Sequence, residues 1–202
     1  MSFSNPPPSV EQLRQHAPQA LAGFSWQPPW PLQERQTPAA VLVGLLPRAH
    51  GLQLVLTRRT DHLYHHAGQI SFPGGRQEDE DAGLIATALR ESNEEIGLLA
   101  RDVEVLGCLP EYATPSNFRI TPVLALLAPE AALQADPFEV AEIFEVPLAF
   151  ACDERNYQAH RIHWQGGLRE IPALPCNGRF IWGATAGILQ MLAAFMAGIP
   201  RA

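Results

Sequence analysis

The hydrophobic pattern of this chain becomes typical of β-strands from about residue 39 onward. Two aliphatic runs, 39–46 and 51–59, are joined by the short segment PRAHG. Such a pair predicts two antiparallel strands linked as a hairpin. Runs of similar composition predict further strands at 69–75, 103–109, 118–127, 157–164 and around 168–173, and a strand followed by a turn within 139–150.

Two segments at opposite ends of the chain have the pattern of helices. Ser9 followed by Gln12 resembles an N-terminal capping box, which predicts a short helix running to about Leu21 despite Pro18. Residues 183–196 are almost entirely apolar. That run is too short to span a bilayer, so it predicts a helix buried in the core.

A third helix is predicted over 82–98. At about 100° per residue, one narrow arc of this segment is largely apolar and should face the core, and it is formed by Ile85, Leu89, Ser92 and Ile96. Gly97 is well placed to end the helix. Strands that alternate irregularly with these helices indicate an α+β fold with a mixed sheet.

Length and composition favour one domain with an N-terminal extension. The chain has 202 residues, of which 47% are hydrophobic and 17% charged, so it can bury a sizeable core. Residues 1–37 are rich in proline and include PPWPL at 28–32, which reads as an extended linker. We therefore expect a Pro-rich arm with a short helix over 1–37, followed by the domain proper over 38–198.

Charge and cysteine usage exclude several classes of function. The formal net charge is −7, and all 14 basic residues are arginines. Without lysine the chain can form neither a Schiff base nor a P-loop. The acidic balance argues against nucleic acid as a partner. The three cysteines are widely spaced, so no zinc or disulfide pattern is visible. No apolar run is long enough for the membrane and no signal peptide is evident, so we expect a cytoplasmic protein.

The helix over 82–98 also carries the most informative polar cluster. Glu91 and Glu95 lie roughly 40° apart on the helical wheel, with Glu94 further round. Like charges near a helix C-terminus repel each other and oppose the helix dipole. A bound divalent cation would remove both penalties, and oxygen-only ligands favour Mg²⁺ or Mn²⁺. The helix alone leaves open a second interpretation, a solvated acidic face.

The segment before this helix favours the metal site. FPGG at 72–75 provides a tight turn and a close backbone approach, which suit a phosphate chain that must reach both turn and helix. Arg90 precedes Glu91 directly, and we expect it to form an ion pair that orients a carboxylate.

At this point a family resemblance is evident. The stretch from Gly75 to Leu98 resembles the Nudix box, G-x5-E-x7-R-E-U-x-E-E-x-G-U, and it matches at Arg90, Glu91, Glu94, Glu95, Gly97 and Leu98. Arg90 stands fifteen positions after Gly75, where the pattern has fourteen. Ala82 occupies the position of the first box glutamate, so the fourth carboxylate is expected from Asp81 or from outside the box.

The segment 54–75 is similar to the region that precedes the box in the coenzyme A pyrophosphatase branch, with matches at Leu56, Thr57, Arg59, Thr60, Gly68 and Phe72–Gly75. Tyr64 stands where that branch has arginine. The similarity continues through 109–123, 139–150 and 178–189. It implies a Nudix-type α/β/α sandwich around a mixed sheet, with a catalytic loop–helix–loop motif.

The resemblance also implies a reaction. This is the metal-dependent hydrolysis of a pyrophosphate bond in a nucleoside diphosphate derivative. In this branch coenzyme A or a derivative would give 3′,5′-ADP and 4′-phosphopantetheine. The expected binding partner is then a small nucleotide. Whether the protein forms a homodimer is left open. Two alternatives are a Nudix enzyme for a dinucleotide, ADP-sugar or nucleoside triphosphate, and a catalytically silent nucleotide-binding domain.

The expected site residues follow from the matched positions. The resemblance assigns catalysis to Arg90, Glu91, Glu94 and Glu95, of which the three glutamates would hold Mg²⁺ or Mn²⁺. The expected substrate contacts are Arg59, Gly74, Gly75 and Tyr112. Arg59 fits either a phosphate clamp or a plain ion pair. A base outside the box could be Glu139 or Glu142, whereas His62, His65 and His66 receive no catalytic role.

Overall fold

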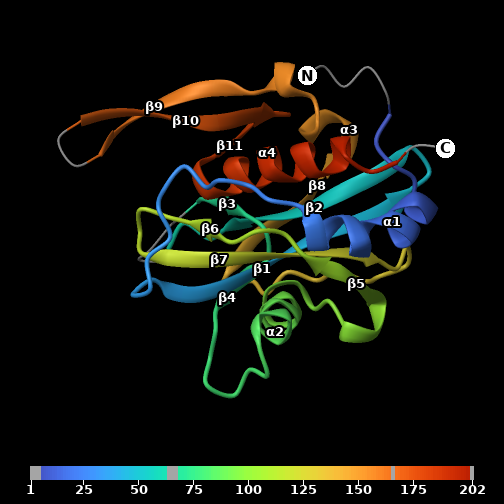
Figure 1. Cartoon of the computed structure of the whole chain (residues 1–202). Helices are drawn as coiled ribbons and strands as arrows, with labels where there is room; N and C mark the ends of the chain where they lie inside the picture. The colour runs from blue at the N-terminus through green and yellow to red at the C-terminus, as the bar shows by residue number, and fades with distance from the viewer. Residues whose placement is uncertain (1–5, 63–67, 165–166, 201–202) are drawn as a thin grey trace.

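The computed structural model describes residues 6–62, 68–164 and 167–200 of the chain. A mixed sheet lies at its centre with helices on both faces (Figure 1). The sheet has eight strands, which are β1 (Thr37–Arg48), β2 (Gly51–Arg59), β3 (Ile70–Ser71), β4 (Gly74–Arg76), β5 (Val103–Cys108), β6 (Tyr112–Ala113), β7 (Phe118–Leu127) and β8 (Val140–Pro147).

One parallel pair makes this sheet mixed. The main order is β3-β2-β1-β7-β5, while β4 pairs with β1, β6 with β7 and β8 with β2. Strands β1 and β7 run parallel, from Thr37 opposite Phe118 to Leu45 opposite Leu126, and the other pairs are antiparallel. Since β4 pairs with the start of β1, the Gly-Gly turn lies near the middle of the sheet.

Each face of the sheet packs against its own helical layer. The helix α2 (Leu84–Ile96) covers one face through a small core that includes Leu42, Ala88 and Val123. The larger core lies on the other face under α1 (Val10–Gly23), α3 (Leu148–Ala151) and α4 (Gly183–Ala197). Short 3-10 turns occur at Ala100–Asp102 and Glu154–Asn156. The predicted α+β sandwich with a mixed sheet is thus confirmed.

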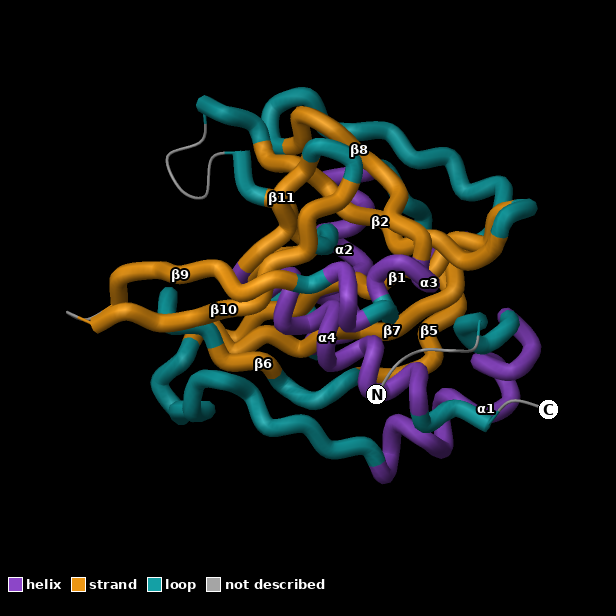
Figure 2. Tube along the Cα trace, turned by 90° about the horizontal axis from the view of Figure 1, so that it is seen from above, coloured by secondary structure: helices purple, strands orange, loops and turns teal. Residues whose placement is uncertain are grey.

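A second, three-stranded sheet projects past one end of α4 (Figure 2). It has the order β11-β10-β9 and is formed by β9 (Gln158–Trp164), β10 (Gly167–Cys176) and β11 (Arg179–Trp182). The alternating pattern predicts β9 and part of β10, but it does not show that these strands leave the main sheet. That separation depends on long-range packing, which local periodicity does not record.

Most predicted elements are present. The hairpin of β1 and β2 is antiparallel, and β7 covers 118–127 as expected. Ser9 and Gln12 form the reciprocal capping box, at 2.8 and 3.2 Å. The apolar helix α4 is buried, although Met196 is followed by one further helical residue.

The buried face of α2 differs from the prediction at Ile85, whose side chain is 40% exposed. The face that meets the sheet contains Ala88, Ser92, Glu95 and Ile96. Its centre is turned toward Glu95, which accepts a hydrogen bond from the backbone of β4. The helical wheel places Glu95 beside the apolar arc, whereas in the structure Glu95 lies within the buried face, so that face is centred closer to Glu95 than the wheel predicts.

The N-terminal helix contributes to the core of the domain. Leu13 and Ala17 of α1 have no exposed surface, and the helix packs against β5. Within the part of the chain that the structure describes, no helix is long and apolar enough to cross a membrane.

This packing predicts that Leu13→Ala lowers the free energy of unfolding by about 2–5 kcal/mol, because it removes a buried side chain and leaves a cavity. Gln15 on the same helix is exposed, so Gln15→Ala should change stability by less than about 0.5 kcal/mol. Urea unfolding measures both. Equal stabilities for the two variants would show that α1 does not belong to the cooperative core.

Candidate active site

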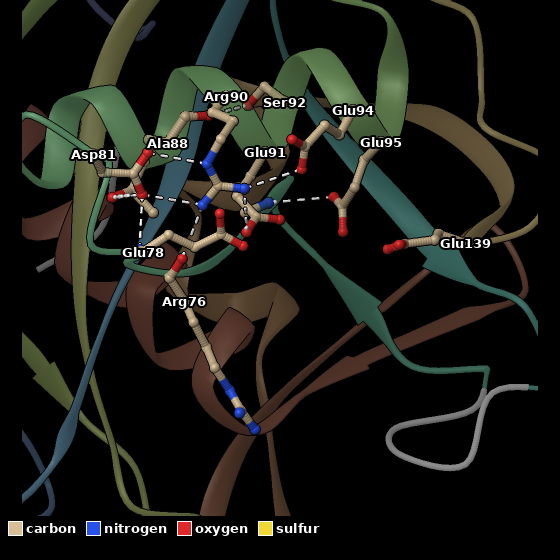
Figure 3. Close-up of polar contacts among 12 residues, drawn as sticks. Arg76, Glu78, Asp81, Ala88, Arg90, Glu91, Ser92, Glu94, Glu95 and Glu139 are labelled. Carbon is tan, nitrogen blue, oxygen red and sulfur yellow. Dashed lines mark hydrogen bonds and ion pairs between the residues drawn. The ribbon is translucent and has the colours of Figure 1, made fainter.

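The acidic cluster lies at the C-terminal half of α2, on the side where β4 ends (Figure 3). The helix stops at Gly97, whose φ of 65° is left-handed, as the sequence predicts. Residues beyond β7 then cross this helix end. The amides of Gln134 and Asp136 donate to the carbonyls of Ile96 and Glu95, both at 2.9 Å. This crossing brings Glu139 to the cluster from a distant part of the sequence.

The guanidinium of Arg90 joins the parts of the site (Figure 3). It donates two hydrogen bonds to Asp81 at 3.0 Å, and it contacts one oxygen each of Glu91 and Glu94, also at 3.0 Å. A further hydrogen bond of 3.0 Å goes to the backbone carbonyl of Arg76. Arg90 therefore holds the loop, the helix and the end of β4 together, and its place within the cluster fits a positioning residue.

Asp81 is fully engaged by this network. Besides Arg90 it accepts hydrogen bonds from the Thr87 hydroxyl and the Glu78 amide, both at 2.9 Å. The hydrogen bonds from Arg90, with those from Glu78 and Thr87, hold the pKa of Asp81 well below its ordinary range. Asp81 lies on the far side of Arg90 from Glu94 and Glu95 (Figure 3). Its geometry therefore does not suit the role of fourth metal carboxylate.

The two glycines of the turn are required by close contacts. Gly74 has φ +153°, and a methyl group there would overlap the Ala40 carbonyl oxygen. A methyl group on Gly75 would overlap the Glu91 carboxylate. The Gly74 amide donates to Glu95 at 3.2 Å. The turn thus touches the glutamates of α2 directly, and a side chain at position 75 would displace the Glu91 carboxylate.

Glu95 is the most deeply buried carboxylate of the cluster, with 3% of its side chain exposed. Burial raises its pKa to about 8, although hydrogen bonding from Gly74 and the charge of Arg59 act in the opposite direction. Repulsion from Glu91 and Glu139 adds to the increase. Burial likewise raises the pKa of Glu91. The helix therefore presents carboxylates whose negative charge is poorly compensated.

Arg59 belongs to this cluster and not to an ion pair within the hairpin. Its guanidinium donates to Glu95 at 3.3 Å and lies 3.9 Å from Glu139. Its Nε is buried and has no hydrogen-bond partner among the residues that the structure describes. A phosphate clamp at Arg59 stays a prediction.

The predicted positions Tyr64, His65 and His66 lie outside the described residues, and His62 packs edge-on against Phe138.

The two candidate bases are separated by the structure. Glu142 forms an ion pair with Arg179, and that hydrogen bond lowers its pKa. Glu139 stands beside Glu95 (Figure 3) and is 46% exposed. Of the two, only Glu139 is placed to act with the glutamates of α2.

Tyr112 lies on the opposite face of the sheet, in the wall of a cavity of about 550 Å³. Its ring is buried and packs against Gly187 of α4, where a methyl group would overlap the hydroxyl. Burial raises its pKa to about 12. The cavity is mainly apolar, and its lining includes Trp30, Phe72, Phe118, Trp164, Trp182 and Ile188.

The donor set fits a hard divalent cation in its chemistry. Glu91, Glu94, Glu95 and Glu139 offer only carboxylate oxygens, the ligands that Mg²⁺ and Mn²⁺ prefer. In the described residues, no three acidic, histidine or cysteine side chains already converge on one point. Glu91 turns to Arg90 and Glu95 to Arg59, so cation binding requires these side chains to exchange partners.

A mixed sheet with a Gly-Gly turn leading into a glutamate-bearing helix is the arrangement of one family. The model described as NUDIX domain matches residues 35–164, and the chain belongs to this family. It is therefore a Nudix hydrolase, a class that cleaves pyrophosphate bonds and generally uses divalent cations such as Mg²⁺ or Mn²⁺.

Curated relatives agree with this assignment. A protein described as uncharacterized Nudix hydrolase NudL from Shigella flexneri serotype 5b (strain 8401) is 40% identical over 163 residues, which is 81% of this chain and 83% of the relative. The protein of the same description from Cronobacter sakazakii (strain ATCC BAA-894) is 41% identical over 162 residues, covering 80% and 83%.

A solved structure supports the fold. The Nudix hydrolase RenU from M. Smegmatis aligns with a TM-score of 0.55 at 21% identity, over 83% of this chain and 89% of that one.

The burial of Glu95 predicts a pH-dependent stability. Because its pKa of about 8 exceeds the ordinary value of about 4.3, the folded protein holds a proton that the unfolded chain releases between these pH values. Without divalent cations, Glu95 should therefore make stability fall as pH rises, by up to about 1.4 kcal/mol per pH unit.

Urea unfolding from pH 5 to 8 in a chelator measures this slope. Glu95→Gln should flatten it, whereas Glu130→Gln, which removes an exposed charge on the loop after β7, should leave it unchanged. A slope that survives Glu95→Gln in full would contradict the assignment.

Proposed function

We propose that this Nudix hydrolase cleaves the pyrophosphate bond of coenzyme A or one of its derivatives, giving 3′,5′-ADP and 4′-phosphopantetheine. The observation that carries the reaction is the position of Glu91 and Glu95 directly against the Gly74–Gly75 turn. A diphosphate lying along this turn would meet backbone and carboxylates together. The segment 54–75, which resembles the coenzyme A branch, supports the substrate.

The glutamates would hold the metal ions. Glu91 and Glu95 are the proposed direct ligands, with Glu94 and Glu139 as proposed assisting groups. When bound, Mg²⁺ or Mn²⁺ supplies neutralisation of the phosphate charge and a lowered pKa for water. Glu139 is the proposed base, since it is exposed at the edge of the cluster.

The remaining polar groups position these carboxylates. Arg90 keeps Glu91 and Glu94 on one side of the helix while Asp81 balances its charge. Arg59 is already paired with Glu95. If a cation binds Glu95, the planar guanidinium of Arg59 would become available for a phosphate oxygen, as the expected phosphate clamp requires.

One assay tests the reaction and the substrate together. We expect the protein with Mg²⁺ or Mn²⁺ to convert coenzyme A to the two stated products, while NADH, ADP-ribose and diadenosine polyphosphates react more slowly. Chromatography of the products identifies the cleaved bond. If another member of the panel is cleaved and coenzyme A is not, the branch assignment is wrong; if none is cleaved, the proposed activity is wrong.

A matched pair of variants tests the carboxylates. Glu95→Gln should lower the rate by about 100-fold or more, because electrostatic stabilisation of a developing charge is of this size. Glu130→Gln removes one charge from an exposed loop and should stay within about twofold. A Glu95→Gln enzyme with the wild-type rate would exclude Glu95 from the metal site.

A further inference from the structure

The cavity on the face of the sheet opposite α2 combines aromatic rings with arginine. Trp30 from the N-terminal arm and Trp164 at the end of β9 meet edge to face, with ring centroids 6.0 Å apart. Arg169 of β10 lies over the Trp30 ring at 5.0 Å. The blue arm passes under the orange strands in Figure 1, which brings these distant segments together. Trp30 and Arg169 both fall outside the 35–164 region that matches the family model.

Two arginines at this cavity stand out by their charge. Most arginines of the described chain pair with an acidic side chain. In the described residues, neither Arg76 nor Arg169 has a carboxylate within ion-pair distance, and each lies over an aromatic ring of the cavity wall. Glu170, which also lines the wall, is paired with Arg161 at 2.9 Å. An acidic protein thus keeps unneutralised guanidinium groups beside an aromatic cavity.

The cavity is close to the scissile site. Ser71 and Phe72 form part of its wall, and the next residues of the same turn contact the glutamates. Arg76 contacts a residue of each place. Its carbonyl accepts a hydrogen bond from Arg90, and its side chain extends away from α2 to lie 5.3 Å over the Phe118 ring (Figure 3). A ligand with its diphosphate at the Gly-Gly turn could therefore extend into the cavity past Arg76.

We infer that this cavity binds the phosphorylated nucleoside half of the substrate. The purine ring packs against the wall formed by Trp30 and Trp164, and the phosphate outside the scissile diphosphate pairs with Arg169. A guanidinium over an aromatic face keeps its N–H edge available for such an oxyanion. Arg76 lies between this group and the diphosphate. The inference rests on the proposed function, since it places one half of that substrate.

Tryptophan fluorescence provides a test that does not depend on catalysis, because Trp30, Trp164 and Trp182 line the cavity. We expect 3′,5′-ADP to quench the emission and to bind at least about tenfold more tightly than 5′-AMP, which lacks the second phosphate. In Arg169→Gln this ratio should fall to near one. Arg101→Gln, which removes an exposed arginine of the 3-10 turn before β5, should leave the ratio unchanged.

One further variant and one further ligand complete the test. Trp30→Ala should weaken both nucleotides, and its melting temperature reports whether the arm still packs. The other product, 4′-phosphopantetheine, should not quench the emission. An unchanged ratio in Arg169→Gln, or quenching by 4′-phosphopantetheine but not by 3′,5′-ADP, overturns the inference. If either of these results is obtained while coenzyme A is still hydrolysed, the inference fails and the proposed function stands. If coenzyme A is not hydrolysed, the proposed function and the inference both lose their basis.

Discussion

The geometry of the active site depends on the guanidinium of Arg90. Its N–H groups point in fixed directions in one plane, and they are used by Asp81 in the loop, by Glu91 and Glu94 on the helix, and by the carbonyl of Arg76 at the end of β4. The loop can close onto the helix only where all these acceptors meet. The same contacts therefore fix both the shape of the loop–helix motif and the direction of its carboxylates.

This arrangement is costly for the stability of the fold. Glu95 is buried beside two other carboxylates, and its pKa is raised to about 8 by that burial. A buried, weakly compensated charge is unfavourable for folding, and such groups gather at functional sites. The Gly74 amide and Arg59 reduce the penalty without removing it. A divalent cation bound at the cluster would neutralise the negative charge that these two contacts leave unbalanced.

Local sequence patterns predict the parts of this fold that local contacts decide. The Ser9 capping box, the hairpin of β1 and β2, and the stop of α2 at Gly97 each depend on neighbouring residues. The buried face of α2 was predicted wrongly at Ile85, because an apolar arc does not show that the polar Glu95 is buried against β4. Neither the engagement of Asp81 by Arg90 nor the approach of Glu139 to Glu95 follows from spacing.

Long-range packing also explains why sequence patterns do not predict the part of the cavity formed by Trp30, Trp164 and Arg169. Trp30 lies in PPWPL, which reads as a linker, and it meets Trp164 and Arg169 only after the arm has folded back. The proposed activity depends most on metal binding by the acidic cluster, and Mn²⁺ binding measured by electron paramagnetic resonance tests this directly. Glu95→Gln should weaken Mn²⁺ binding at least about tenfold, whereas Glu130→Gln should bind Mn²⁺ as the wild type does. Wild-type Mn²⁺ affinity in Glu95→Gln would contradict a metal site at this cluster.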